Sequence, residues 1–286
     1  MTYENLLKLA YKKAKSHHKE DEAVKLLLME LSQQDPHQFY LHLTDETGLD
    51  FEKQYLEKLD QYLLEDIPVQ HLIGHSYFFG YQFDVNKDVL IPRSETEQLV
   101  EHILYYYDQY FNDQKLKVLD LGTGSGCIGL TLALEEKNLD VTITDISQDA
   151  LKIASKNKQK LNANAKVIQS DLFNQVQSKF DMIISNPPYI PDDEVVQDIV
   201  LKEPSVALYG GKLGVDFYER ILKESKAFIN EKGLIGFEHG FQQKSQIYEF
   251  AHQYYPKANI IQIKDLQGKD RFTFIGIGGV LEHEKR

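Results

Sequence analysis

The sequence predicts an α/β protein built around a seven-stranded, mostly parallel sheet with helices on both faces, preceded by a small all-helical domain. Two patterns predict this architecture. After Lys115, short β-branched runs alternate with stretches of helical periodicity, which is the order typical of parallel strands joined by helices. Before about residue 75, apolar residues recur only at helical spacing. A chain of 286 residues that is 42% hydrophobic is large enough for both parts.

The first 75 residues are expected to form a helical domain of four or five helices. Apolar residues three and four positions apart mark the helical faces, as in the pair Leu7–Ala10 and the pair Val24–Leu28. Asp35-Pro36 and Thr47-Gly48 are turn signals between helices. We therefore predict a domain over residues 1–75.

Residues 76–92 are expected to form a β-hairpin that links the helical domain to the rest of the chain. Apolar and polar residues alternate in Y-F-F-G-Y-Q-F-D-V-N-K-D-V-L-I-P around Asn86-Lys87-Asp88, which favours a hairpin with its turn there. A helix rich in aromatic residues should follow from Glu95 to Phe111. The larger domain is then predicted over residues 93–286.

Seven strands and four further helices are expected in that larger domain. The strands are K-V-L-D-L, V-T-I-T-D, K-V-I-Q-S, F-D-M-I-I-S, L-I-G-F-E, I-I-Q-I-K and R-F-T-F-I-G-I. The helices are expected at 127–136, 148–161, 215–230 and 241–255.

Composition and charge restrict the kind of protein. Cys127 is the single cysteine, so no internal disulfide or cysteine-based zinc site is possible, which suits a cytoplasmic location. No run is long enough to cross a membrane, and the histidines show no metal-ligand spacing. The net charge is −12, and residues 1–75 hold 8 Lys and 14 acidic residues, a net −6. This balance argues against nucleic acid as the main partner, because duplex binders usually present a basic face.

A glycine-rich loop follows the first strand of the predicted sheet, in V-L-D-L-G-T-G-S-G-C. Ligands of open parallel sheets bind beyond the carboxyl ends of the strands, where glycines let the backbone approach the ligand. A dinucleotide loop would require a glycine at position 127, where this chain has Cys127. The spacing G-x-G-x-G resembles instead the first motif of class I S-adenosylmethionine-dependent methyltransferases. That resemblance implies that S-adenosylmethionine, which becomes S-adenosylhomocysteine, is held by Gly122, Thr123, Gly124, Ser125 and Gly126.

Acidic residues near the ends of three strands support the same interpretation. Asp145 closes the second strand, where its carboxylate can accept hydrogen bonds from both ribose hydroxyls. The resemblance implies that Asp120 faces the methionine ammonium group, while Asp171 and Leu172 hold the adenine amine and cover its ring. Taken singly, each aspartate could equally be a solvated residue at a strand end. The glycine loop alone could be an ordinary tight turn.

The sequence N-P-P-Y ends the fourth strand, next to the strand that carries the glycine loop. Proline cannot continue a central strand, so the residues Asn186, Pro187, Pro188 and Tyr189 should form a rigid loop. A planar amine becomes a better nucleophile when two acceptors grip its N–H groups and favour the positive charge that develops on nitrogen. The Asn186 side-chain oxygen and the Pro187 carbonyl are the expected acceptors. Tyr189 is expected to pack on the flat face of the group, and Asn186 also to contact the cofactor.

This motif resembles the fourth motif of amino methyltransferases, but it leaves the identity of the amine open. Adenine, cytosine, guanine and the glutamine side chain all present the same chemical group. An ordinary rigid exit from a strand, without chemical importance, is the alternative interpretation of the motif.

Segments outside these motifs resemble the release factor glutamine methyltransferase family, HemK/PrmC. They are P-V-Q-H-L-I-G, F-F-G-Y-Q-F, V-L-I-P-R-S-E-T-E, E-P-S-V-A-L-Y-G-G, G-F-E-H-G and D-L-Q-G-K-D-R. The resemblance implies a Rossmann-like methyltransferase sheet and methylation of the glutamine of a Gly-Gly-Gln motif in class I peptide chain release factors. It also implies that the acidic N-terminal domain docks the release factor. The chain departs from the family at Ser94, where proline is usual, and at Leu172, where some members have an aromatic residue.

Three other functions remain open from the sequence. The amine could belong to a glutamine of a ribosomal protein or to a base of a nucleic acid, or the chain could be a binding module that has lost catalysis. For Arg93, Glu95 and Glu203 we expect structural roles in ion pairs or hydrogen bonds that fix loops. A monomer without a membrane or direct nucleic-acid partner is expected.

Overall fold

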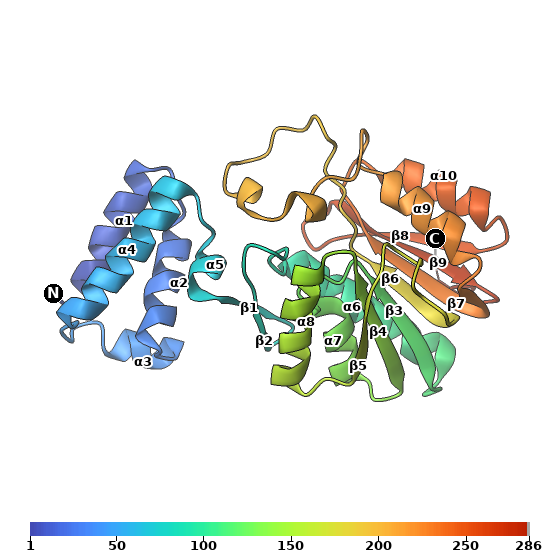
Figure 1. The fold of residues 1–286 in the computed structure, drawn as a ribbon, viewed down its shortest axis with the longest axis horizontal. Helices are drawn as coiled ribbons and strands as arrows, with labels where there is room; N and C mark the ends of the chain where they lie inside the picture. The colour runs from blue at the N-terminus through green and yellow to red at the C-terminus, as the bar shows by residue number, and fades with distance from the viewer. Residues whose placement is uncertain (285–286) are drawn as a thin grey trace. The chain divides into compact units, whose positions relative to one another are not determined.

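The computed structural model describes residues 1–284 and divides the chain into two compact units (Figure 1). The first comprises Met1–His75 together with Val196–Lys202. The second comprises Ser76–Val195 and the chain from Glu203 onward. The short segment 196–202 in the first unit had no counterpart among the sequence predictions.

The first unit contains five helices, α1 (Tyr3–Ser16), α2 (Asp21–Ser32), α3 (Pro36–Leu41), α4 (Leu49–Glu65) and α5 (Val69–Ile73). The Asp35-Pro36 signal marks the start of α3. The Asp35 side chain accepts a hydrogen bond from the Gln38 backbone N–H, and Pro36 is the first residue of the helix. The core of the unit is formed by apolar residues of these helices, and Ile199 of the segment 196–202 packs against it.

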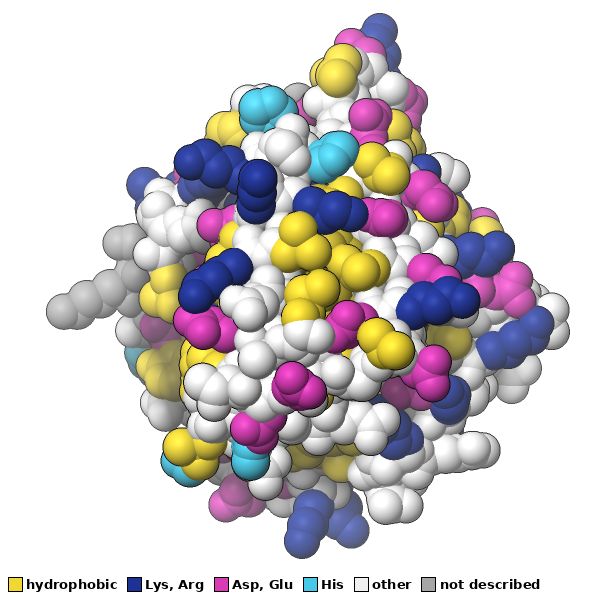
Figure 2. Space-filling view, turned by 90° about the vertical axis from the view of Figure 1, so that its left-hand side faces the viewer, with side chains coloured by type: hydrophobic (Ala, Val, Ile, Leu, Met, Phe, Trp, Pro, Cys, Tyr) yellow, Lys and Arg dark blue, Asp and Glu magenta, His cyan; other side chains and the backbone are white. Residues whose placement is uncertain are grey.

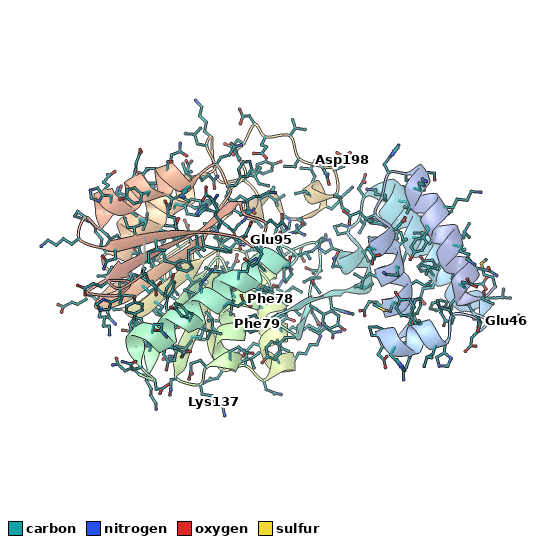
Figure 3. The ribbon with its side chains drawn as sticks, turned by 180° about the vertical axis from the view of Figure 1, so that it is seen from behind. Glu46, Phe78, Phe79, Glu95, Lys137 and Asp198 are labelled. Carbon is teal, nitrogen blue, oxygen red and sulfur yellow. The ribbon has the colours of Figure 1, made fainter. Side chains whose placement is uncertain are left out.

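The predicted hairpin exists, but it turns earlier than the sequence pattern indicated. Its strands are β1 (His75–Phe78) and β2 (Tyr81–Asp84), and the turn is formed by Phe79 and Gly80. Both turn residues have positive φ, 52° and 78°, as a two-residue hairpin turn requires. The Phe79 backbone N–H donates to Glu97 Oε1 at 2.7 Å. This hydrogen bond connects the turn to the helix that contains Glu95 and Glu97; Phe79 and Glu95 are labelled in Figure 3. Asn86-Lys87-Asp88 forms a separate turn, in which Asn86 Oδ1 accepts from the Asp88 N–H.

The second unit confirms the predicted sheet. Seven strands lie in the order β5-β4-β3-β6-β7-β9-β8, and only β9 runs antiparallel to its neighbours. Their bounds are β3 (Leu116–Leu121), β4 (Leu139–Asp145), β5 (Ala165–Gln169), β6 (Phe180–Ser185), β7 (Ile229–Glu238), β8 (Asn259–Lys264) and β9 (Asp270–Ile277). Strands β3 and β6 are adjacent, so the glycine loop and the N-P-P-Y motif leave the sheet side by side.

Helices cover both faces of this sheet, as predicted. Side chains alternate along each strand, so that Val118 and Met182 enter one core while Leu119 and Ile183 enter the other. The first core is completed chiefly by α6 (Ser94–Phe111) and α7 (Cys127–Glu135), with a contribution from α8 (Gln148–Leu161). The second core is completed by α9 (Asp216–Ser225) and α10 (Lys244–Tyr254).

Two helix boundaries differ from the predictions by more than one residue. Helix α9 was expected to reach residue 230 but ends at Ser225, because β7 begins at Ile229, which pairs with Phe180. Helix α10 was expected from residue 241 but begins at Lys244, since the preceding residues form a turn in which the Gly240 N–H donates to Gln243 Oε1. Short 3-10 turns at Val200–Lys202 and Ser205–Ala207 lie in the connection between β6 and α9.

Candidate functional site

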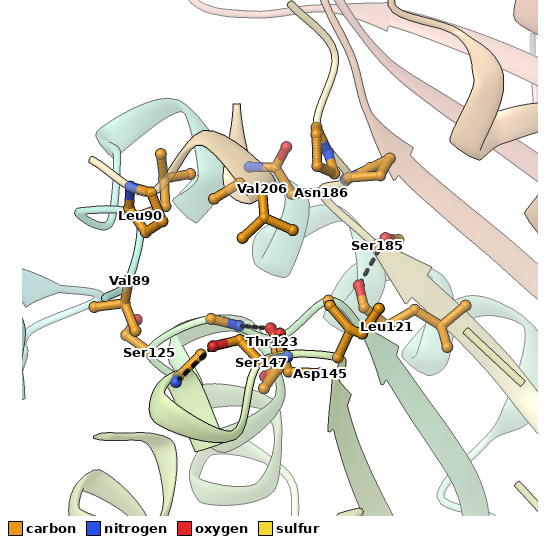
Figure 4. Close-up of a pocket in the computed structure, with 18 of the residues that line it drawn as sticks. Val89, Leu90, Leu121, Thr123, Ser125, Asp145, Ser147, Ser185, Asn186 and Val206 are labelled. Atoms are coloured by element: carbon orange, nitrogen blue, oxygen red, sulfur yellow. Dashed lines mark hydrogen bonds between the residues drawn. The ribbon is translucent and has the colours of Figure 1, made fainter. Parts of the chain in front are cut away.

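A cavity of about 220 Å³ opens at the carboxyl ends of the parallel strands in the second unit (Figure 4). Its walls come from the segments that follow β3, β4, β5 and β6, and from residues 88–96, 204–207 and α9. In Figure 4, Asn186 and Val206 lie across the open space from Thr123, Ser125 and Asp145. The predicted cofactor loop and the predicted catalytic loop therefore share one cavity.

The glycine loop forms an open cradle on one wall. Gly122 and Gly124 adopt positive φ of 70° and 56°, and a Cβ at either position would meet no atom within 4 Å. Thr123 and Ser125 line the cavity with them. Gly126 is different, because a Cβ there would lie 2.7 Å from Leu130 Cδ1, and Gly126 does not line the cavity. Gly126 thus allows the loop to pack against α7, while the other two glycines leave space for a ligand.

Asp145 lies at the end of β4, where it lines the cavity and fixes the loop. Its Oδ2 accepts from the Gly124 N–H at 2.9 Å, and its Oδ1 accepts from the Ser147 N–H at 2.9 Å. Burial raises the pKa of Asp145, and these backbone N–H groups oppose that effect. A carboxylate has about four acceptor positions, so each oxygen keeps one for a ligand hydroxyl.

Asp120 does not line the cavity, although the sequence led us to expect it to face a ligand. It is 0% exposed, and its Oδ2 accepts from Thr123 Oγ1 at 2.5 Å and from the Gly129 N–H at 3.0 Å. Its Oδ1 has no hydrogen-bond partner among residues 1–284. Burial raises the pKa of Asp120 to about 6. Asp120 therefore supports the glycine loop from within the fold, and the cavity wall does not support its expected contact with an ammonium group.

Asp171 and Leu172 follow β5 and line the cavity, as the sequence predicted. Leu172 has a φ of 48°, which turns the chain sharply there. Two further lining residues, Phe217 and Arg220 of α9, were not predicted. Arg220 donates to Asp171 Oδ1 at 3.1 Å and lies 5.9 Å from the centre of the Phe217 ring. No motif marks these two residues, because only the tertiary fold brings α9 to the segment after β5.

Asn186, Pro187 and Pro188 line the wall opposite the glycine cradle. The Asn186 Nδ2 group donates to Thr96 Oγ1 at 3.3 Å, which directs the nitrogen of the amide toward α6. Neither Asn186 Oδ1 nor the Pro187 carbonyl oxygen accepts a hydrogen bond from residues 1–284. Ser185 Oγ donates to the Leu121 carbonyl at 2.7 Å and so joins the ends of β6 and β3 directly below the motif. The two expected acceptors are thus free in a rigidly held loop.

Tyr189 is placed differently from the prediction. Its side chain packs against the core beside α9 and α10, and it does not line the cavity. Burial raises the pKa of its hydroxyl to about 12. The Tyr189 carbonyl accepts from Gln243 Nε2 at 2.6 Å, and the same amide donates to the Gly214 carbonyl at 3.0 Å. In this structure Tyr189 anchors the motif, so its expected packing on the acceptor group is not supported.

An ion pair between a half-exposed arginine and a buried carboxylate fixes another wall of the cavity. Arg93, which lines the cavity, pairs with Glu203, and Glu203 Oε2 also accepts from the Ile91 N–H at 2.8 Å. These contacts hold the segment before α6 against the loop that follows the motif, which agrees with the structural roles expected for both residues. Glu95 accepts a hydrogen bond from Gln267 Nε2 at 3.3 Å.

The arrangement fits a ligand that contains a nucleoside. The open cradle admits a ligand against the backbone, and Asp145 offers acceptors for ribose hydroxyls. Leu172, Ile146 and Phe217 provide apolar surface for a base.

Within residues 1–284, no group of three or more His, Cys, Asp or Glu residues is arranged to hold a metal ion. Over the same part of the chain, no helix has both the length and the apolar character needed to cross a membrane.

Comparison with known proteins finds a matching family for each of the two units. Residues 96–234 match the family described as methyltransferase small domain, and residues 5–74 match the PrmC N-terminal domain. A release factor glutamine methyltransferase of Bacillus cereus is 38% identical over 243 residues, which cover 82% of this chain and 84% of that protein. The protein of the same description from Bacillus subtilis is 38% identical over 260 residues, which cover 88% and 90%.

Solved structures agree on the fold. A methyltransferase from Pyrococcus furiosus superimposes with a TM-score of 0.53 at 19% identity, over 82% of this chain and 100% of that chain. The catalytic domain of human Mettl16, solved with an RNA hairpin, gives a TM-score of 0.55 at 16% identity, over 86% and 90%. At this identity the likeness concerns the fold alone.

Proposed function

The chain belongs to the release factor glutamine methyltransferase family, and from this premise we propose that it methylates a class I peptide chain release factor. The methyl group would come from S-adenosylmethionine. The acceptor would be the side-chain amide nitrogen of the glutamine in the Gly-Gly-Gln motif. One observation carries the proposal: Asn186 and Pro187 line the same cavity as the glycine cradle, and neither of their two acceptor oxygens has a hydrogen-bond partner among residues 1–284.

The proposed cofactor residues are those that form the cradle and the walls beside it. Asp145 would accept from the ribose hydroxyls, and Leu172 and Phe217 would flank the adenine. When bound, S-adenosylmethionine supplies an electrophilic methyl carbon on a sulfonium. The backbone of residues 122–125 would hold the ligand without steric conflict, because the positions of Gly122 and Gly124 are open.

The proposed catalytic work of the protein is to orient the glutamine amide. Asn186 Oδ1 and the Pro187 carbonyl would each accept one N–H of its NH2 group, which fixes the plane of the amide and the direction of the nitrogen lone pair. Both acceptors would interact more strongly with the nitrogen as it becomes positive, so they stabilise the transition state more than the bound substrate. The nitrogen becomes acidic once it bonds to the methyl carbon, so its proton can pass to water without a strong base.

The helical unit is the proposed docking surface for the release factor. Its residues 1–75 carry a net charge of −6, which suits a basic protein surface. It also exposes large apolar side chains, namely Tyr40, Leu41, Leu49 and Leu64. Figure 2, which looks onto this unit, shows hydrophobic side chains gathered among charged ones. Such a mixed surface is typical of protein interfaces.

The test is methyl transfer from isotopically labelled S-adenosylmethionine to four separate acceptors: purified release factor, ribosomal proteins, DNA and RNA. We expect label in the release factor, on the glutamine of Gly-Gly-Gln when the digested product is sequenced by mass spectrometry. A release factor in which that glutamine is replaced should take up no label. Label confined to nucleic acid or to a ribosomal protein would overturn the proposed substrate while leaving the chemistry of the cavity intact.

A further inference from the structure

Glu238 is a buried carboxyl group that none of the sequence motifs assigned to the site. It is the last residue of β7, the neighbour of β6, and only 2% of it is exposed. Its backbone carbonyl accepts from the Tyr218 hydroxyl at 2.9 Å, which holds the end of the strand. Its side-chain Oε2 has no hydrogen-bond partner among residues 1–284. A buried carboxyl with an unpaired oxygen is costly, which makes Glu238 a candidate for a functional role.

The residues beside this carboxyl are the motif asparagine and the threonine that binds it. Glu238 follows Phe237, which pairs with Ser185 in the register of β7 and β6, so Glu238 and Asn186 leave the sheet side by side. Thr96 and Asn186 are placed to donate to the carboxylate, and this opposes the rise of its pKa. Thr96 is itself buried and accepts from Asn186 Nδ2 at 3.3 Å. Because that acceptor position is used, the Thr96 hydroxyl proton is free to be donated to the Glu238 carboxylate. That donation would link the Asn186 amide through Thr96 to Glu238.

An ionised carboxylate can only accept hydrogen bonds, and this decides the orientation of the Asn186 amide. With acceptors at both Thr96 and Glu238, the NH2 end of the amide must face them, and the oxygen must face the cavity. A flipped amide would place its oxygen against these two acceptors and present N–H groups to the substrate amine. That orientation could not grip the N–H groups of an incoming glutamine.

We propose that Glu238 is a positioning residue that keeps the Asn186 oxygen directed at the substrate amide, acting directly and through Thr96. The inference rests on the proposed function, because it assigns to Asn186 the role of acceptor. Glu238 touches neither reacting group and acts on catalysis only through the asparagine. Its effect should therefore fall on kcat and leave cofactor binding unchanged.

The surroundings of Glu238 make the orientation of the Asn186 amide sensitive to pH. Burial raises the pKa of Glu238 to about 7, while the hydrogen bond from Thr96 and the positive charge of Arg271 on β9 oppose the shift. The negative charge of Glu95 on α6 raises the pKa of Glu238 further. The hydroxyl of Tyr189 and the thiol of Cys127 also face the group, and their raised pKa values keep both neutral near pH 7.

The sign of the pH effect follows from these interactions. Above its pKa the carboxylate accepts from both partners and the Asn186 amide is oriented for catalysis. Below its pKa the protonated carboxyl can donate to the Asn186 oxygen and stabilise the flipped amide. The kcat of the wild-type protein should therefore fall as the pH is lowered through about 7.

The decisive experiment compares kcat between pH 5.5 and 8.5 for the wild type and Glu238→Gln. The Gln side chain has a similar shape but places N–H donors near the Asn186 amide, so we expect kcat at pH 8 to fall by about 10- to 100-fold. The pH dependence near 7 should also disappear, while the cofactor Kd stays within about threefold of the wild type. Asp120, with a pKa of about 6, is unchanged in both proteins. A Glu238→Gln variant with the wild-type kcat and pH profile would overturn the proposal.

Substitutions of Thr96 give an independent arm if the Glu238 variant is unstable. Thr96→Val keeps the shape and removes the hydroxyl, and it should lower kcat by about tenfold. Thr96→Ser restores the hydroxyl and should recover most of that loss. Thr131→Val is the matched control, because Thr131 is a buried threonine whose hydroxyl has no partner in the described chain. Equal losses for Thr96→Val and Thr96→Ser, or a loss for Thr131→Val, would contradict the chain of hydrogen bonds.

A spectroscopic measurement separates this inference from the proposed substrate. The side-chain amide resonances of Asn186, recorded with ¹⁵N-asparagine labelling, should shift with a midpoint near pH 7 in the wild type and lack that transition in Glu238→Gln. This needs no methyl acceptor. If the release factor is not methylated but the transition is present, only the proposed substrate fails. If the release factor is methylated and the transition is absent, only the role of Glu238 fails.

Discussion

Replacing Asn186 with alanine is the most direct test of the site, because the structure separates the catalytic role of this residue from its contribution to folding. The substitution removes one of the two acceptor oxygens and leaves the Pro187 carbonyl in place. Loss of one preorganised group that stabilises transition-state charge typically lowers kcat by about 10²- to 10³-fold, or roughly 3–4 kcal/mol. We expect a loss of this size.

The same structure limits the other consequences of Asn186→Ala. The cradle at Gly122–Ser125 and the carboxylate of Asp145 do not contact the lost amide through any hydrogen bond, so the cofactor Kd should change by less than about threefold. The Asn186–Thr96 hydrogen bond is long, at 3.3 Å, so its removal should cost about 1 kcal/mol. For a chain of this size, that corresponds to a fall in Tm of about 2–4 °C.

The assay is steady-state methylation of an intact release factor, with cofactor binding followed by calorimetry and Tm by scanning calorimetry. Asn230→Ala is the matched control, since Asn230 lies near the other end of β7, donates to Asp181 Oδ1 at 2.7 Å and does not line the cavity. It should lose some stability and keep the wild-type kcat. An Asn186→Ala protein with more than about a third of the wild-type kcat would refute the role of acceptor.

Three further substitutions test other parts of the proposal. Asp145→Asn should raise the cofactor Kd by about 10- to 100-fold in calorimetry, because an acceptor for ribose becomes a donor; an unchanged Kd would remove Asp145 from the binding site. Gln243→Leu removes donors to the carbonyls of Tyr189 and Gly214, so Tm should fall by several degrees and kcat should fall with it, whereas the exposed neighbour Gln242 should tolerate the same change. Replacing Leu41 and Leu49, which are 65% and 83% exposed, with serine should raise KM for the intact release factor without altering the cofactor Kd. An unchanged KM would argue against docking at those two residues.

The elements that the sequence predicted best are those whose ends carry their own local signals. Helix α8 was predicted with its observed bounds, because Ser147 caps its first turn and Asn162 ends it in the left-handed conformation. The end of α9 could not be predicted in this way, since the residues after Ser225 are recruited by pairing with β6. The hairpin turn was misplaced because Phe79-Gly80 lies within an apolar run, while Asn86-Lys87-Asp88 has the polar composition usual for turns.

The site shows the same division between local and tertiary information. The motif residues reach one cavity because each follows a strand of a parallel sheet, and that much follows from pattern alone. The direction in which a side chain points does not follow from the sequence pattern. Tyr189 turns into the core beside α9, and Asp120 turns beneath the loop, because packing far away in the sequence decides both. Thr96 and Glu238 are separated from Asn186 by 90 and 52 positions, so no motif could have joined them.

The segment between the motif and α9 bears on how the docking role can be tested. The chain leaves Tyr189, contributes Val196–Lys202 to the helical unit, and returns to the second unit at Glu203, whose carboxylate pairs with Arg93 in the cavity wall. A deletion of residues 1–75 would therefore do more than remove a docking surface. It would leave Ile199 without the core against which it packs, and it would free the connection that begins just after the motif. Loss of activity in such a truncation would not identify a docking surface, whereas exchange of exposed residues such as Leu41 and Leu49 leaves that connection intact.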